Sequence, residues 1–346
     1  MAGKFDRLSE LRKYIDKSQA GIEVAPYCTP IAPRSDGYRT IVMDVFDTDT
    51  IRERAAKDVT IEKEKIALIE DVDVIGDASD IVALSEAVRA EHPINYIVSS
   101  HNFEHLPNPI KFLAGCAEIL QDGGVLSMAI PDYRTCFDHF RYPTNLAEWL
   151  DAYHRPTDMP SPARIFEAFS VYAEYAEGDT RHLAFNFDQA EPRKFRSQVD
   201  LKSLYQTYVS RLDGSFDYVD SHFSAMFDKT FELMICDLIW LEILDFEILE
   251  ISPTRGHEFF VHLRKPLKPT AAIDQYQDVR MKLLHEIQFG LGAQAFKTVR
   301  ARQVFRLSDL SVYSFFNPKH LARRLMGEAF FTRLRVMNAA RKNRQR

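Results

Sequence analysis

The sequence predicts an α/β protein with a doubly wound, mostly parallel seven-stranded sheet that ends in an antiparallel β-hairpin. Two observations carry this prediction. Short apolar runs alternate with amphipathic helical patterns up to Asp132, and such alternation is typical of a parallel sheet covered on both faces. Farther along, two apolar runs follow one another directly, joined by a short turn that contains Gly256, as in a hairpin at a sheet edge.

The first part of the chain supplies three strands. Apolar periodicity and turn residues predict an N-terminal helix carrying Leu8, Leu11 and Tyr14, strands over 20–25, 38–46 and 72–75, and helices over 51–57 and 79–90. Thr48 or Asp49 is expected to cap the helix over 51–57, because their side-chain oxygens can accept from the free amides of its first turn.

The clearest unit is a β-α-β pattern between residues 94 and 132. INYIVSS (94–100) and GGVLSMAIPD (123–132) have the composition of buried strands, and the segment 108–121 between them repeats apolar residues at helical spacing. Gly123 and Gly124 mark the helix exit, where glycine adopts positive φ at low cost. The crossover is expected to be right-handed.

A polar, aromatic-rich segment from Arg141 to about Asp220 interrupts this alternation and is predicted to be a helical insertion. The alternation returns with a helix over 229–244 and strands over 246–252 and 259–265. From Pro266 onward the pattern is helical and its end is basic, with nine Lys or Arg against one Glu between Lys319 and Arg346. The sequence therefore predicts a helical C-terminal tail.

The composition indicates an ordinary globular protein and excludes several classes. The 346 residues are 46% hydrophobic and 27% charged, and the net charge of -6 gives no global attraction for nucleic acid, so no nucleic-acid partner is expected. The four cysteines form no C-x-x-C pair, which argues against a zinc finger or a disulfide framework. The charged N-terminus and the acids that interrupt 231–248 predict a soluble, cytoplasmic protein.

Motifs in the β-α-β unit carry a family resemblance. Glu104, His105, Leu106, Asn108 and Pro109 open the helix, and Gly123-Gly124 leads into the next strand. With GIEVAP and IVMDVF upstream, this pattern resembles the class I, Rossmann-like methyltransferases that use S-adenosylmethionine (SAM), especially the type 11 group. The segments 131–141 and 245–265 resemble a bacterial subgroup associated with surface-polysaccharide biosynthesis. The resemblance implies a methyltransferase domain over 1–265, with the insertion at about 141–220, and a basic extension over 266–346.

The resemblance also implies a set of cofactor-binding residues. Asp44 matches the acid that accepts hydrogen bonds from both ribose hydroxyls, and Asp77 matches the residue facing the adenine amine. The first loop and the end of the fourth strand would lie beside the methionine end, which adds Gly21, Glu23, Ala25, Ser100 and His101. Ala25 stands where the family usually has glycine. The acids have a second interpretation, because Glu23 and Asp77 also suit a turn or a helix cap.

The family's chemistry requires a base when the methyl acceptor is a hydroxyl. O-methylation of a saccharide or glycan intermediate is the reaction that the resemblance implies, and the acceptor must lose a proton as the new bond forms. The candidate catalytic residues follow the fourth and fifth strands or the insertion, and they are His101, His105, Asp132, His139 and His222. His139 and His101 are favoured, because an imidazole titrates near neutrality.

Other functions remain as alternatives. No G-x-G-x-x-G turn, phosphate loop or nucleophile elbow supports an oxidoreductase, kinase or hydrolase. No metal is predicted; His101, Glu104 and His105 could share a helical face, but Pro107 and Pro109 argue against that helix. The chief alternative is an inactive methyltransferase-like scaffold that acts through its basic tail. There, aromatic and basic residues over 315–335 could form a helix lying on an anionic membrane or a partner protein.

Overall fold

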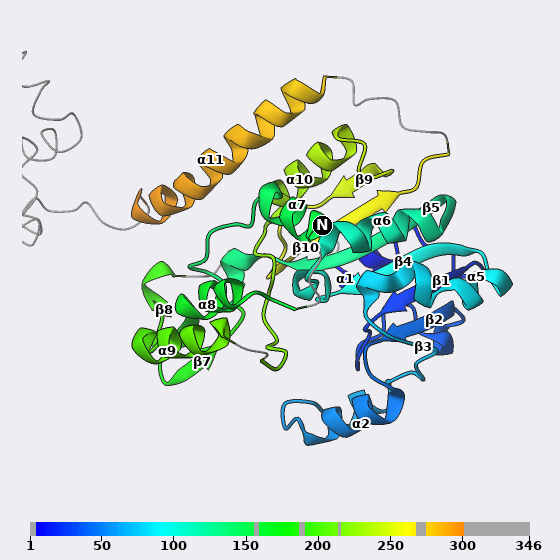
Figure 1. Ribbon diagram of the computed structural model, residues 1–346, viewed down its shortest axis with the longest axis horizontal. Coiled ribbons are helices and arrows are strands. Elements are labelled where there is room, and N and C mark those ends of the chain that lie inside the picture. Colours follow the sequence, from blue (N-terminus) through cyan, green and yellow to red (C-terminus); the bar gives the residue numbers. More distant parts are fainter. Residues whose placement is uncertain (1–4, 156–158, 187–190, 214–215, 268–274, 301–346) are drawn as a thin grey trace, which may run out of the picture. The chain divides into compact units, whose positions relative to one another are not determined.

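The computed structural model describes residues 5–155, 159–186, 191–213, 216–267 and 275–300. The described residues up to Leu291 form one compact unit. This unit is built on a seven-stranded sheet of order β3-β2-β1-β4-β5-β10-β9 (Figure 1). Its strands are β1 (Ala20–Val24), β2 (Arg39–Asp44), β3 (Val74–Ile75), β4 (Ile94–Ser100), β5 (Leu120–Pro131), β9 (Glu247–Ile251) and β10 (Glu258–Arg264). The predicted seven-stranded sheet is confirmed.

Strand directions decide which residues meet at one edge of the sheet. The strands β3, β2, β1, β4 and β5 pair in parallel, whereas β10 is antiparallel to both β5 and β9. The carboxyl ends of the five parallel strands therefore share an edge. Because β10 runs the other way, its first residue, Glu258, pairs with Pro131 at that same edge. The predicted antiparallel ending of the sheet is confirmed.

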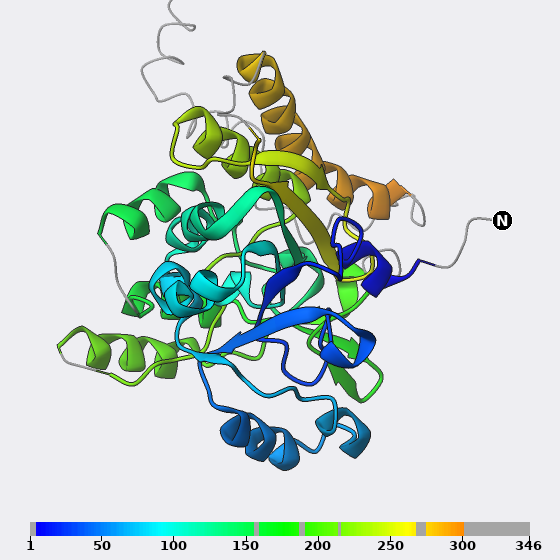
Figure 2. The same ribbon diagram turned by 90° about the vertical axis from the view of Figure 1, so that its right-hand side faces the viewer.

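The sheet is buried on both faces by different helices. On one face Tyr96, Val98 and Phe260 pack with Leu11 of α1 (Arg7–Leu11). On the other face Ile97, Leu126 and Phe259 pack with apolar residues of α6 (Pro109–Ile119) and α10 (Asp228–Trp240). Figure 2 shows α1, in dark blue, across the sheet from the cyan helices. Adjacent residues of β4 thus alternate between the two cores, as the period of a strand requires.

Two helix predictions are corrected in detail. Helix α2 (Thr48–Lys57) is capped by Asp47, whose side chain accepts from the Thr50 amide at 2.7 Å, so the prediction of Thr48 or Asp49 as cap was wrong. Thr48 is engaged elsewhere, accepting from the Val72 amide at 2.9 Å. The single helix expected over 79–90 is instead a short 3-10 turn followed by α4 (Ile81–Leu84) and α5 (Glu86–Glu91). The Ser85 hydroxyl at this break donates to the Ile81 carbonyl, a local bond that competes with helix continuation.

The segment predicted as an insertion is helical and also holds a small sheet. It contains α7 (Leu146–His154), α8 (Pro162–Ser170), α9 (Leu201–Leu212) and an antiparallel sheet of order β7-β6-β8, formed by Thr180–His182, Glu174–Glu177 and Phe195–Arg196. Two buried side chains fasten it to the chain that follows. Trp149 donates to the Ser224 hydroxyl at 3.0 Å, and Arg141 donates to the His222 carbonyl at 2.7 Å.

The C-terminal helix α11 (Tyr276–Arg300) begins inside this compact unit. Asp237 of α10 accepts from the Tyr276 hydroxyl at 2.6 Å and from Arg280 at 3.1 Å. The compact unit thus includes residues beyond 265, and the division into a methyltransferase domain over 1–265 and an extension over 266–346 stays a prediction. The basic segment over 315–335 lies outside the described residues. Among the residues that are described, no helix is both long and apolar enough to cross a membrane.

Candidate active site

A cavity of about 530 Å3 opens at the carboxyl ends of β1, β2 and β3. Its lining includes Ala25, Asp44 and Asp77, three of the residues predicted to bind a cofactor, together with Asn102 and His105 from the segment after β4. The strand order reverses here, because β1 has β2 on one side and β4 on the other. Open α/β sheets bind ligands in the crevice at such a point.

Asp44 and Asp77 face this cavity from neighbouring strand ends. Asp44 is the last residue of β2, is only 7% exposed, and accepts from the Phe46 amide at 3.0 Å. Burial raises the pKa of Asp44, although the amides of the following turn oppose the shift. Asp77 accepts from the Ser79 amide at 2.7 Å and caps a 3-10 turn. Asp77 thus caps the turn and also lines the cavity, so a capping role does not exclude cofactor binding.

Glu23 and Gly21 do not line the cavity. The buried Glu23 carboxylate accepts from the amides of Ile31 and Ala32, at 2.5 and 2.9 Å. Burial raises its pKa to about 7 despite these bonds. A Cβ on Gly21 would lie 2.2 Å from the Tyr96 ring, so a side chain is excluded there by packing. Both residues shape the strand and loop behind the cavity.

Ala25 makes the turn that brings backbone to the cavity wall. Its φ is +49°, in the left-handed region, and its amide donates to the Met43 carbonyl at 2.8 Å. Tyr27 also has positive φ, at +48°. This conformation costs residues other than glycine about 1 kcal/mol or more. Ala25 adopts it at the position where the methyltransferases that the sequence resembles usually have glycine.

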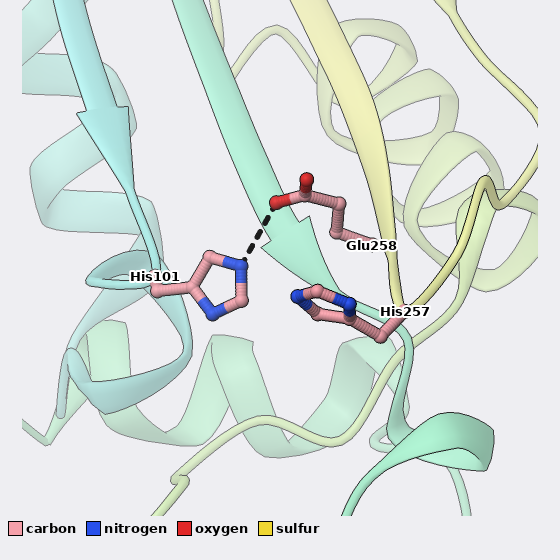
Figure 3. A group of neighbouring side chains, drawn as sticks. All are labelled: His101, His257 and Glu258. Atoms are coloured by element: carbon pink, nitrogen blue, oxygen red, sulfur yellow. Dashed lines mark hydrogen bonds and ion pairs between the residues drawn. The ribbon is translucent and has the colours of Figure 1, made fainter. Parts of the chain in front are cut away.

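His101 lies at the same sheet edge, beside two residues of the hairpin (Figure 3). Its Nε2 donates to Glu258 at 2.9 Å, and the His257 ring lies 5.7 Å away. Arg7 of α1 donates to both oxygens of Glu258, at 2.7 and 3.0 Å, and to the Ser100 hydroxyl at 2.5 Å. Burial alone would raise the pKa of Glu258, but the bonds from His101 and Arg7 hold it at about 2.

Sequence reasoning missed Arg7, His257 and Glu258. The predicted antiparallel direction of the last strand could have indicated His257 and Glu258. It places the turn PTRGHE at the edge where the parallel strands have their carboxyl ends. Arg7 gave no signal, since 251 residues separate it from Glu258.

His105 and His222 come together around the buried Glu104. Their rings are 4.7 Å apart, and the Nε2 atoms of His105 and His222 lie 3.8 and 3.9 Å from Glu104 Oε1. Asp220 accepts from His105 Nδ1 at 2.9 Å, and Asp138 accepts from His222 Nδ1 at 2.5 Å. Burial opposes protonation of His105, but Asp220 and Glu104 together raise its pKa.

The structure does not bring Asp132 and His139 to the cavity. Asp132 is fully buried and accepts from Arg134 and from the Thr254 hydroxyl. The His139 ring stacks on Phe195 with centroids 3.7 Å apart, and its Nδ1 donates to the Arg134 carbonyl at 2.7 Å. Burial lowers the pKa of His139. Of the five predicted catalytic residues, His105 alone appears among the residues that line this cavity.

No protein-family model matches the sequence, and no curated protein matches it at a significant level. The chain is similar in structure to a SAM-dependent methyltransferase from Methanosarcina mazei, with 11% identity over 77% of this chain and 100% of that one, and a TM-score of 0.35.

Two further structures are comparable. A SAM-dependent methyltransferase from Clostridium acetobutylicum has 9% identity, coverage of 77% and 93%, and a TM-score of 0.38. The CcbJ methyltransferase from Streptomyces caelestis has 14% identity, coverage of 76% and 97%, and a TM-score of 0.36. These likenesses are distant, so the assignment of the fold stands on the strand order and directions given above. That sheet, mostly parallel and ending in the antiparallel β10 and β9, is the doubly wound α/β fold class predicted from the sequence.

Proposed function

We propose that this protein is a SAM-dependent methyltransferase that holds its cofactor in the cavity over β1, β2 and β3. The observation that carries the proposal is the pairing of Asp44 and Asp77, which line one cavity from the ends of neighbouring strands at the reversal of strand order. The volume, about 530 Å3, lies in the usual range for small-molecule sites.

The lining offers a partner to each part of the cofactor. Asp44 would accept from the ribose hydroxyls, and Asp77 from the adenine amine, through charge-assisted hydrogen bonds. Phe46 adds an apolar side chain to the same lining. The Asn102 side-chain amide is buried and has no hydrogen-bond partner among the described residues. Asn102 could therefore donate to the methionine carboxylate near the turn at Ala25.

We place the methyl acceptor over β4, β5 and β10, beside His101 and His257. Transfer is an in-line displacement in which the acceptor oxygen bonds to the methyl carbon, the sulfur–carbon bond breaks, and S-adenosylhomocysteine (SAH) leaves. The hydroxyl proton would pass to His101, whose Nε2 is fixed by Glu258, so that Nδ1 is the atom available to accept it. Arg7 and Glu258 act as positioning residues. A saccharide or glycan hydroxyl is the acceptor class that the sequence resemblance favours.

Calorimetry with SAM and SAH tests the cofactor site. The full chain should bind both in the micromolar range, and Asp44→Ala should weaken binding by about 1.5–3 kcal/mol, because bonds to a charged group are lost. Asp49→Ala, an exposed acid on α2, is the matched control and should bind as the wild type does. Equal affinity of wild type and Asp44→Ala would reject the role of Asp44.

The alternative function, an inactive scaffold, makes a different prediction. Absence of SAM and SAH binding by the wild-type chain would favour it. Where binding is found, transfer of a labelled methyl group into fractionated cell extract, followed by identification of the labelled product, would define the acceptor.

A further inference from the structure

The cluster of Glu104, His105 and His222 contains a buried carboxylate whose oxygens accept no hydrogen bond among the described residues. Glu104, which carries this carboxylate, is 1% exposed. Burying an ionised carboxylate is costly unless it is paired or coordinates a cation. The cluster is formed by the 3-10 turn after β4 (Phe103–His105) and by the segment that follows the insertion.

The two imidazoles are oriented as metal ligands are. His105 and His222 each direct Nδ1 at a carboxylate, Asp220 and Asp138 respectively. A donated Nδ1–H leaves a lone pair on Nε2, and both Nε2 atoms lie within 3.9 Å of Glu104 Oε1. These separations are too long for hydrogen bonds. Carboxylates that fix the far nitrogen of a histidine are the usual outer partners of metal-binding imidazoles.

Two other groups of histidine, cysteine and acidic side chains have the spacing of a cation site. In each of them, however, the carboxylate is already bonded to an arginine. At Glu258, Arg7 donates to both carboxylate oxygens. In the group of Cys136, Asp138 and His222, Asp138 accepts from Arg141 through one oxygen and from His222 through the other. A second cation beside either guanidinium would be repelled. Glu104 differs because no arginine or lysine side chain bonds to it within the described residues.

We propose that Glu104 and the Nε2 atoms of His105 and His222 form a binding site for a divalent transition-metal ion of the zinc class. Two nitrogens and one carboxylate are a common ligand set for Zn2+ and for neighbouring metals of the first row. Ligand atoms about 2.0–2.1 Å from a tetrahedral ion stand about 3.3 Å apart. The three ligand atoms here lie within 4.8 Å of one another, so binding would require them to move closer together.

The site adjoins the proposed cofactor cavity, since His105 and Asp220 also line that cavity. Three protein ligands leave at least one coordination position for water or for an oxygen of another molecule. The metal site does not depend on the methyltransferase proposal, because its evidence is the charge and geometry of this cluster alone.

Metal content of the purified full chain tests the proposal. Bound metal is first removed from the protein with a chelator. Separate samples are then dialysed against Zn2+, Co2+ and Mn2+, desalted, and their metal content is measured by elemental mass spectrometry. We expect about one equivalent of at least one metal, a higher Tm with that metal, and visible d–d absorption where Co2+ is bound. Glu104→Gln should abolish retention, and Asp220→Asn should weaken affinity about 10–100-fold, as loss of an outer partner does.

The control is a pair of the same chemistry outside the cluster. His182 Nε2 lies 3.7 Å from Glu177 Oε2, but both side chains are about half exposed, so His182→Asn should retain metal as the wild type does. Retention of none of the three metals by the wild type overturns the proposal. Retention that is unchanged in Glu104→Gln and Asp220→Asn, or that is lost in His257→Ala instead, also overturns it. Circular dichroism of each stripped variant confirms that folding is intact.

Discussion

Glu258 and Glu104 stand at the same edge of one sheet, and each has histidine neighbours, yet their surroundings differ in charge. Glu258 is 4% exposed and accepts from Arg7 and His101. Glu104 is 1% exposed, and its carboxylate accepts no hydrogen bond among the described residues. The first carboxylate is neutralised by the fold itself, through a helix at the other end of the chain. The second carboxylate has no hydrogen-bonded partner among the described residues. Burial alone therefore does not say what a carboxylate does.

This contrast separates two tasks along the edge. Arg7 balances the charge of Glu258 and fixes its carboxylate, which in turn orients His101. In the second cluster no side chain of the described residues donates a hydrogen bond to the Glu104 carboxylate, and its neighbour His105 lines the cavity. Variants of the two clusters should accordingly differ in catalysis, in stability and in their response to pH.

The largest expected effect is on turnover. If Glu258 orients His101 as the general base, His101→Ala should lower turnover by roughly 10²–10⁴-fold, the effect expected for loss of a general base. The affinity for SAM should be preserved. The measurement is methyl transfer to the identified acceptor, alongside calorimetry with SAM. His182→Ala, at a partly exposed histidine of β7 in the small sheet, serves as the control. Near wild-type turnover of His101→Ala would assign proton removal to another residue or to water.

Glu258→Gln should cost the most stability. A carboxyl whose pKa falls from 4.5 to about 2 on folding stabilises the native state by on the order of 3 kcal/mol at neutral pH. Because the folded-state pKa is lowered, this stabilisation is fully present above pH 4.5 and is lost as the pH falls toward 2. Urea unfolding at several pH values should show the deficit of Glu258→Gln at pH 6 shrinking toward pH 3. A deficit that does not change with pH would contradict a charge-based role.

Glu104→Gln should have the smallest effect, although it is the same substitution at a more buried site. In metal-free protein it should leave the free energy of unfolding within about 1 kcal/mol of the wild type, or raise it, because it removes an unpaired buried charge rather than a bonded one. Urea unfolding in the presence of a chelator measures this. A loss comparable to that of Glu258→Gln would show that protonated histidines already balance Glu104, and the two clusters would then be alike.

Local patterns determined much of the fold. The strand predicted at 94–100 matches β4, since its apolar residues, concentrated at 94 and 96–98, suit a strand buried on both faces. Asn108 followed by Pro109 begins α6 as the motif indicated. The acids that end β2 and follow β3 reach one cavity because parallel neighbours end at one edge. These features depend on residues close together in the sequence or on the direction of adjacent strands.

Tertiary packing decided the rest. Glu23 and Asp44 both end apolar runs, but only the fold turned the first toward the amides of Ile31 and Ala32 and left the second facing the cavity. His105 meets Asp220 across 115 residues, and Arg7 meets Glu258 across 251. Hydrophobic periodicity states which face of an element is buried. It does not state which distant side chain supplies the partner, because that depends on how the finished layers pack.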